Sequence, residues 1–176
     1  IDGGTAGDDY EIQVVNVTGG AWGIWIDNQG TDTTRVLSTG TVTGLGQAGI
    51  TVAGGVNTTG IDIFANVVNG DTYGIQVTNS GSGNTNILAS GTVAAATQTG
   101  IVAVNDVNTT NLSLSTVDVL GARGIVAQNY GGGATQILST GQIVGFAGEG
   151  VWLENDSATT HAVVNVEDVG GEDTGI

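Results

Sequence analysis

Residue types that could support catalysis are sparse and scattered along the chain. Asp118 and Asp168 occupy matching positions two repeats apart, so strand spacing would separate them by roughly 10 Å, close to the separation of glycosidase carboxylates. The repeat between them offers Ile143, which cannot assist a reaction. Arg35 and Arg123 are the only Arg or Lys residues, and they fall at different repeat positions. No site of opposed charges is therefore expected.

The single histidine gives no better candidate. His161 is expected at an outward position, and no Ser or Cys is placed to act with it as a nucleophile. A catalytic site needs tuned titratable groups that converge in one pocket. The sequence therefore predicts no catalytic residue, and we expect the protein not to be an enzyme.

One acidic stretch near the N-terminus is the candidate for metal binding. Asp8, Asp9 and Glu11 form an acidic corner, and the letters GGTAGDD loosely resemble a calcium-binding nonapeptide repeat. That motif works in tandem copies, and only one imperfect copy is present. We expect no cofactor, with Ca²⁺ at Asp8, Asp9 and Glu11 as the candidate to test.

Composition excludes several classes of partner. The chain has 176 residues with 17 Asp and Glu against 2 Lys and Arg, which gives a formal net charge of −15. Such a charge repels phosphate, so nucleic acids and anionic membrane surfaces are not expected as partners. With no cysteine, the chain cannot form a disulfide or a thiolate metal site. No apolar run approaches the length of a membrane span, so we expect no membrane insertion by this segment.

The element that must position all of these residues is a repeat. A Gly-Ile or Gly-Val dipeptide recurs at spacings of 26, 25, 26, 24, 26 and 25 residues. A period this steady is typical of a stacked repeat architecture. It predicts one β-solenoid segment over residues 1–176, with both ends interrupting a coil of a longer chain. The coils open at Gly23, Gly49, Gly74, Gly100, Gly124 and Gly150.

Each repeat reads as three short strands joined by three corners. Ile24 and Ile26 flank Trp25, and this alternation of apolar and variable residues predicts a strand with one buried face. A second strand and a third strand follow, the third as in Gly40-Thr41-Val42. The sequence therefore predicts an all-β parallel β-helix of triangular section, with about 25 residues per coil and about seven coils.

Two polar columns accompany the strands. An asparagine four residues after the first Ile recurs in five of six repeats and is expected to be buried or half buried, stacking its amide on the next as a ladder; its members are Asn28, Asn79, Asn105, Asn129 and Asn155. Gly54 interrupts the row. A threonine column is predicted to lead the second strand in all six repeats; its members are Thr34, Thr59, Thr85, Thr110, Thr135 and Thr160.

Two further patterns complete the description of the repeat. The coils alternate in type over about two repeats, because VLSTG, ILASG and ILSTG follow Gly23, Gly74 and Gly124 while the intervening coils differ. Trp25, Tyr130 and Trp152 are expected on the surface, where aromatic rings can contact sugars or neighbouring molecules.

The repeat phrase carries a family resemblance over essentially the whole chain. GIxVxN followed by TxILxxGTV, in an acidic chain without cysteine or lysine, resembles the passenger repeats of bacterial autotransporters (type V secretion). The resemblance implies a right-handed parallel β-helix on the surface of a Gram-negative bacterium. It implies a non-catalytic adhesin or stalk segment that contacts a host or neighbouring-cell surface, glycans or like chains.

Two other functions stay open on the sequence. A structural extracellular filament or matrix protein would join its coils laterally or end to end, and unpaired edges at the ends favour such self-association. A polysaccharide lyase or hydrolase would need a cluster of acids and arginines on its loops, which the sequence does not place together.

Overall fold

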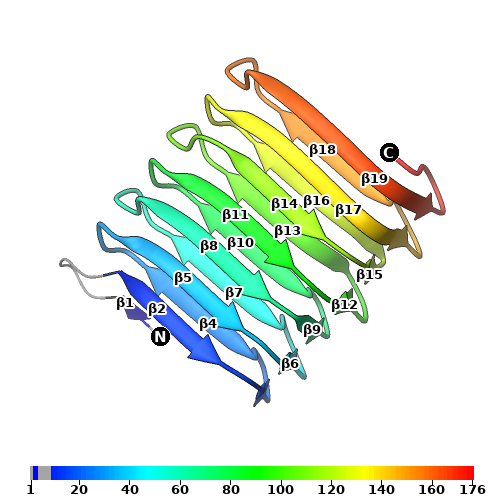
Figure 1. Cartoon of the computed structure of the whole chain (residues 1–176), viewed down its shortest axis with the longest axis horizontal. Coiled ribbons are helices and arrows are strands. Elements are labelled where there is room, and N and C mark those ends of the chain that lie inside the picture. Colours follow the sequence, from blue (N-terminus) through cyan, green and yellow to red (C-terminus); the bar gives the residue numbers. More distant parts are fainter. Residues whose placement is uncertain (1, 4–8) are drawn as a thin grey trace.

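The computed structural model describes residues 2–3 and 9–176, and these residues form parallel β-strands without a helix (Figure 1). The strands stack into a β-solenoid of about 6 turns, spaced about 26 residues apart. The predicted all-β parallel solenoid is therefore confirmed. No helix in the described ranges is long and apolar enough to cross a membrane.

Three columns of strands run along the solenoid. The first column is a seven-stranded sheet: β1 (Asp2–Gly3), β4 (Ile24–Asn28), β7 (Ile50–Gly54), β10 (Ile75–Asn79), β13 (Thr99–Asn105), β16 (Arg123–Asn129) and β18 (Val151–Asn155). The second column contains β2 (Tyr10–Val14), β5 (Thr33–Ser38), β8 (Gly60–Ala65), β11 (Asn84–Ala89), β14 (Leu112–Thr116), and the first parts of β17 (Ala134–Gly145) and β19 (His161–Gly171). The third contains β3 (Val17–Gly19), β6 (Thr41–Gly44), β9 (Val67–Gly70), β12 (Val93–Ala95), β15 (Val119–Gly121), and the later parts of β17 and β19.

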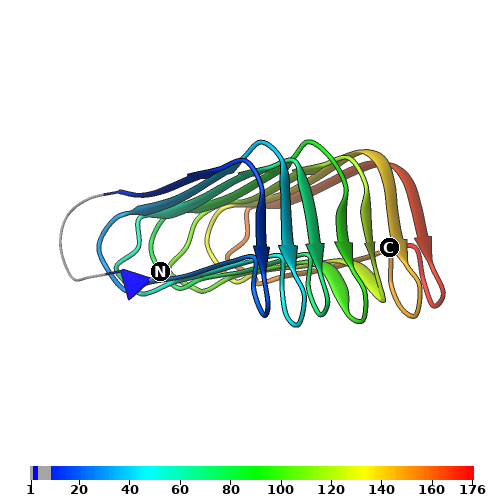
Figure 2. The same ribbon diagram turned by 90° about the horizontal axis from the view of Figure 1, so that it is seen from below.

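The second and third columns belong to one sheet rather than two. In the last two coils, β17 and β19 continue around the corner, with an irregularity in register between Ser139 and Gln142. Figure 2 shows the chain running along one long side, bending at the third column and returning along the other long side. The section is therefore flattened, with one bent sheet facing a flat one, and differs from the predicted triangle.

The core fills the space between these sheets with the predicted inward residues. Ile26, Ile63 and Ile101 are completely buried, and each contributes about 1.5–3 kcal/mol relative to an exposed position. The residues between them face outward, as expected from the period of two. Val126 lies in this outward row, in register between Val102 and Trp152, but it is only 9 % exposed.

The glycine that opens each coil recurs because its neighbours leave no room for a side chain. A Cβ on any of these six glycines would lie 2.4–2.6 Å from a methyl group of the inward-facing Val or Ile in the third column of the same coil. For Gly74 the obstructing groups are Val93 Cγ1 at 2.5 Å and the Gly100 carbonyl oxygen at 2.6 Å. The corner between the third and first columns thus closes too tightly for any side chain, and only glycine fits.

Candidate functional surfaces

The asparagine column exists, and its members are buried where the first column ends. Parallel register pairs Asn79 with Asn105 and Asn129 with Asn155, and Gly54 occupies the gap. Asn28, Asn79, Asn105 and Asn129 are completely buried, and Asn155 is partly buried. The predicted position and burial are confirmed.

The predicted amide-to-amide ladder is wrong, because these asparagines bond to other groups. Asn79 Nδ2 donates to Thr85 Oγ1 at 3.0 Å, and its Oδ1 accepts the Gly81 N–H at 3.0 Å. Thr85 Oγ1 then donates to Asn105 Oδ1 in the next coil at 2.6 Å. The link between coils therefore passes through a threonine hydroxyl, which can donate one bond and accept another.

The same arrangement recurs in the other coils that open at Gly23 and Gly124. Asn28 Nδ2 donates to Thr34 Oγ1 at 2.9 Å, and Asn129 Nδ2 donates to Thr135 Oγ1 at 3.1 Å. Thr135 Oγ1 continues to Asn155 Oδ1 at 2.6 Å. We call this arrangement the Asn-Thr corner; it belongs to the coils that open at Gly23, Gly74 and Gly124.

The alternate coils turn in a different way. The Thr58, Thr109 and Thr159 N–H groups each bond at 3.0 Å to a carbonyl three residues earlier. The side chains of Thr58 and Thr159 donate to main-chain carbonyls of the preceding coil, at Asn28 and Asn129. We call this the Thr-turn corner; it belongs to the coils that open at Gly49, Gly100 and Gly150. The predicted two-coil alternation is a real structural period.

The predicted six-member threonine column is wrong in every second coil. Register places Thr34 opposite Ile61 and Thr85 opposite Leu112, so Thr59 and Thr110 lie outside this column. Thr34, Thr85 and Thr135 are completely buried, whereas Thr59, Thr110 and Thr160 are exposed. The column alternates between a hydroxyl and an apolar side chain, because the two corners differ in length by one residue.

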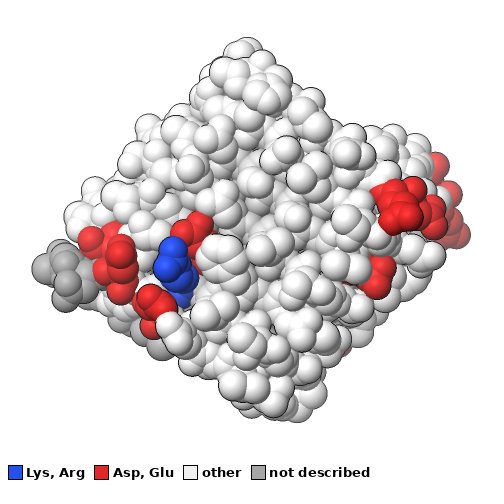
Figure 3. Space-filling view, in the orientation of Figure 1, with Lys and Arg blue, Asp and Glu red and all other residues white. Residues whose placement is uncertain are grey.

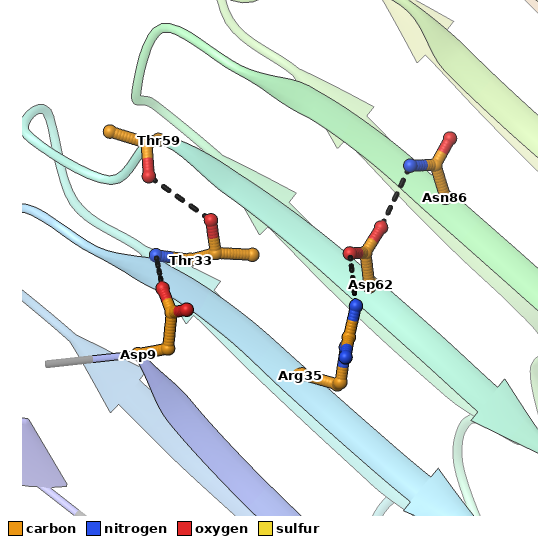
Figure 4. A network of polar contacts seen from close by, with 6 residues as sticks. All are labelled: Asp9, Thr33, Arg35, Thr59, Asp62 and Asn86. Carbon is orange, nitrogen blue, oxygen red and sulfur yellow. Dashed lines mark hydrogen bonds and ion pairs between the residues drawn. The ribbon is translucent and has the colours of Figure 1, made fainter.

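The acidic residues near the N-terminus lie beside an arginine. Asp8 lies outside the described residues. Asp9 Oδ1 accepts the Thr33 N–H at 3.3 Å (Figure 4). Glu11 on β2 is in register with Arg35 on β5. Arg35 also approaches Asp62 Oδ2 at 3.9 Å. Within the described ranges, no three His, Cys, Asp or Glu side chains gather to hold a metal ion. Ca²⁺ binding at Asp8, Asp9 and Glu11 stays a prediction.

One carboxylate of the pair considered for glycoside hydrolysis bonds to the main chain of the solenoid. Asp118 Oδ1 accepts the main-chain N–H of Gln142 at 3.0 Å, and Gln142 is paired with Asp168. The residue between the two acids is therefore Gln142, and the expectation of Ile143 is wrong by one position. His161 is exposed, as expected, with its Nδ1 3.4 Å from Thr160 Oγ1.

The aromatic residues lie on the surface at separate places. Trp25 is 43 % exposed and its ring centroid is 6.2 Å from that of Trp22. Trp152 is 40 % exposed and lies beneath the Arg123 guanidinium, 5.1 Å from the ring centroid. Tyr130 accepts a bond from Gln128, and desolvation together with the neighbouring Glu154 raises its pKa. The structure places the three predicted aromatics in three distinct settings rather than in one site.

The outer face of the second column carries residues that the sequence reasoning did not single out. Figure 3 shows acidic side chains toward the two ends of this face and none in its middle. Leu37, Phe64 and Leu88 lie in register there, pointing outward. A cavity of about 290 Å³ runs along them, and a second of about 270 Å³ adjoins it at Leu37 and Thr39. The detectable signal was the apolar residue between two inward residues of the second strand, as in Val36-Leu37-Ser38.

Comparison with protein-family models, with curated proteins and with solved structures finds no match to this chain.

Proposed function

We propose that this chain is a non-catalytic, extracellular solenoid segment of a bacterial surface protein, acting as an adhesin or as a stalk that presents binding surfaces. The observation that carries the proposal is the continuous outer face of the second column, which repeats across coils with a neutral middle and acidic ends. A regular face of this kind suits weak contacts repeated over many coils, which add by multivalency.

Other features support an exposed location. A net charge of −15 favours solubility, and it disfavours contact with anionic polymers because like charges repel. The repeats resemble those of autotransporter passengers, which face the outside of Gram-negative cells. The partners that we propose are glycans of a host or neighbouring cell, or like chains on that cell.

The experiment displays the full chain on beads and measures their adhesion to glycan-coated surfaces. A matched variant lacks residues 100–149, which removes one coil of each corner type and keeps the alternation. Adhesion that declines in part with this deletion supports the proposal, because contacts are then spread along the rod. Absence of adhesion in the full chain would contradict it.

The enzymatic alternative is tested on the same material. Release of reducing ends or unsaturated products from neutral and acidic polysaccharides is measured with the full chain and with Asp118→Asn. Turnover that is lost in Asp118→Asn would replace the proposal with a hydrolase or lyase, because that substitution removes a carboxylate and keeps its size.

A further inference from the structure

The second-column face has a defined chemical pattern in three successive coils, and this part of the face includes the charged pair of Arg35 and Asp62 beside uncharged residues. It consists of a polar row, an apolar row and a second polar row, each with one residue from β5, β8 and β11 or from the corner that follows each of these strands. The rows are Arg35, Asp62 and Asn86; Leu37, Phe64 and Leu88; and Thr39, Asn66 and Ser90. We call these nine residues the three-row patch.

The first polar row is held in a fixed arrangement. Asp62 Oδ1 accepts a bond from Asn86 Nδ2 at 2.8 Å, and Asp62 Oδ2 is 3.9 Å from Arg35 Nη2 (Figure 4). This ion pair is long, and the Arg35 side chain is 50 % exposed. Most guanidinium donors of Arg35 therefore remain available to a ligand.

The apolar row provides a surface for a ring. Arg35 lies over Phe64 at 5.9 Å from the ring centroid, and Phe64 is partly exposed and lines the groove. Leu88 is 44 % exposed and continues the same row. Leu37 lines both adjoining cavities, so the two hollows meet at this residue.

The second polar row offers unused hydrogen-bonding atoms. Asn66 Nδ2 donates to the Thr39 carbonyl at 3.3 Å, but Asn66 Oδ1 and Thr39 Oγ1 accept or donate no bond within the described residues. Two residues separate neighbouring rows along a strand, so adjacent rows are about 7 Å apart. A ligand lying on the apolar row therefore meets polar groups on both sides.

We infer that the three-row patch binds a linear, uncharged polysaccharide along the solenoid axis; this rests on the proposed adhesive function and specifies its ligand class. A pyranose ring presents an apolar C–H face to Phe64 and Leu88, while its hydroxyls lie at the rim and reach the two polar rows. Asp62 and the net charge of −15 disfavour an acidic glycan. A peptide strand finds no edge to pair with, because β5, β8 and β11 each have partners on both sides.

The test is isothermal titration of the full chain with cellohexaose, mannohexaose, maltohexaose and hexagalacturonate. We expect binding of at least one neutral oligosaccharide and none of hexagalacturonate. Phe64→Ala should weaken that binding about tenfold or more, because it removes the stacking surface. Thr39→Val should weaken it by a smaller factor and tests the second polar row without touching the core.

The matched control is Leu138→Ser, which changes the same outward row in a coil outside the patch and should leave binding unchanged. Circular dichroism melting of each variant checks that it is folded. Failure of every neutral oligosaccharide to bind, equal binding of hexagalacturonate, or equal losses in Phe64→Ala and Leu138→Ser would each overturn the inference.

Two further outcomes are separated by sedimentation and by bead adhesion. Self-association that Phe64→Ala abolishes, without glycan binding, would assign the patch to a second copy of the chain and overturn the inference. Glycan adhesion of displayed chains that Phe64→Ala leaves unchanged would also overturn the patch, but would leave the proposed adhesive function standing.

Discussion

The Asn-Thr corner and the Thr-turn corner satisfy the main-chain groups of their loops in different ways. In the Asn-Thr corner, an asparagine side chain satisfies its own loop by accepting the N–H two residues later, as Asn79 does for Gly81. In the Thr-turn corner, the loop closes through the backbone, and a threonine such as Thr58 donates to the coil before it. One corner is organised by an amide and the other by a main-chain turn.

The difference teaches why the coils alternate. Thr85 of an Asn-Thr corner donates forward to Asn105, and Thr58 of a Thr-turn corner donates back to the Asn28 carbonyl. Each type of corner therefore donates a hydrogen bond to an acceptor in the other type. Two coils of the same type in contact would leave buried polar groups without partners, which is costly.

The largest effect should come from breaking this alternation. Deletion of residues 74–99 removes one coil and stacks two Thr-turn corners, whereas deletion of residues 74–123 removes two coils and keeps the order. We expect the protein with the one-coil deletion to have the lower Tm, although its chain is longer. In that protein Ile61 faces Leu112, and Asn105 Oδ1 loses the Thr85 hydroxyl that donates to it. Thermal unfolding followed by circular dichroism measures both. A higher Tm for the one-coil deletion would show that the alternation is dispensable.

The next effect tests a corner that both coil types share. Gly74→Ala and Gly100→Ala should each lower the free energy of unfolding by about 3 kcal/mol, because the new methyl group overlaps Val93 or Val119. Gly20→Ala is the control, since nothing lies within 4 Å of its added Cβ. Urea unfolding gives the values. Unequal losses for Gly74 and Gly100 would mean that the alternation reaches this corner too.

A smaller difference should separate the asparagines of the two corners. Asn79→Ala removes three bonds, to Thr85, Gly81 and Gly83, and Asn105→Ala removes two, to Thr85 and Asn111. We expect Asn79→Ala to cost about 1 kcal/mol more, the net contribution of one hydrogen bond. Equal values from urea unfolding would contradict a distinct role for the Asn-Thr corner.

A comparison of similar size tests the threonines themselves. Thr85→Val removes a buried hydroxyl that joins two coils and should cost about 1–2 kcal/mol, because Asn105 Oδ1 is left unpaired. Thr59→Val changes an exposed side chain outside that column and should stay within about 0.5 kcal/mol. Their comparison by urea unfolding checks the register directly, and similar losses would restore the six-member column.

The sequence by itself determined the period, the inward residues and the position of the asparagine column. These follow from local rules: side chains alternate along a strand, and stacking repeats one coil upon the next. Ile26, Ile101 and Asn129 are buried where that pattern requires. The glycine that opens each coil was also visible, although its reason, the buried methyl group of the third column, was not.

Only the tertiary structure decided the threonine register, the partners of the asparagines and the three-row patch. Thr85 lies six residues after Asn79, whereas its register partner Leu112 lies seven residues after Asn105. Thr110, five residues after Asn105, concealed this one-residue difference between the corners because it is also a threonine. Contacts between coils depend on such corner lengths, since one residue more or less changes which side chains meet. Leu37, Phe64 and Leu88 are separated by more than twenty residues, and they form one row only because parallel register aligns their coils.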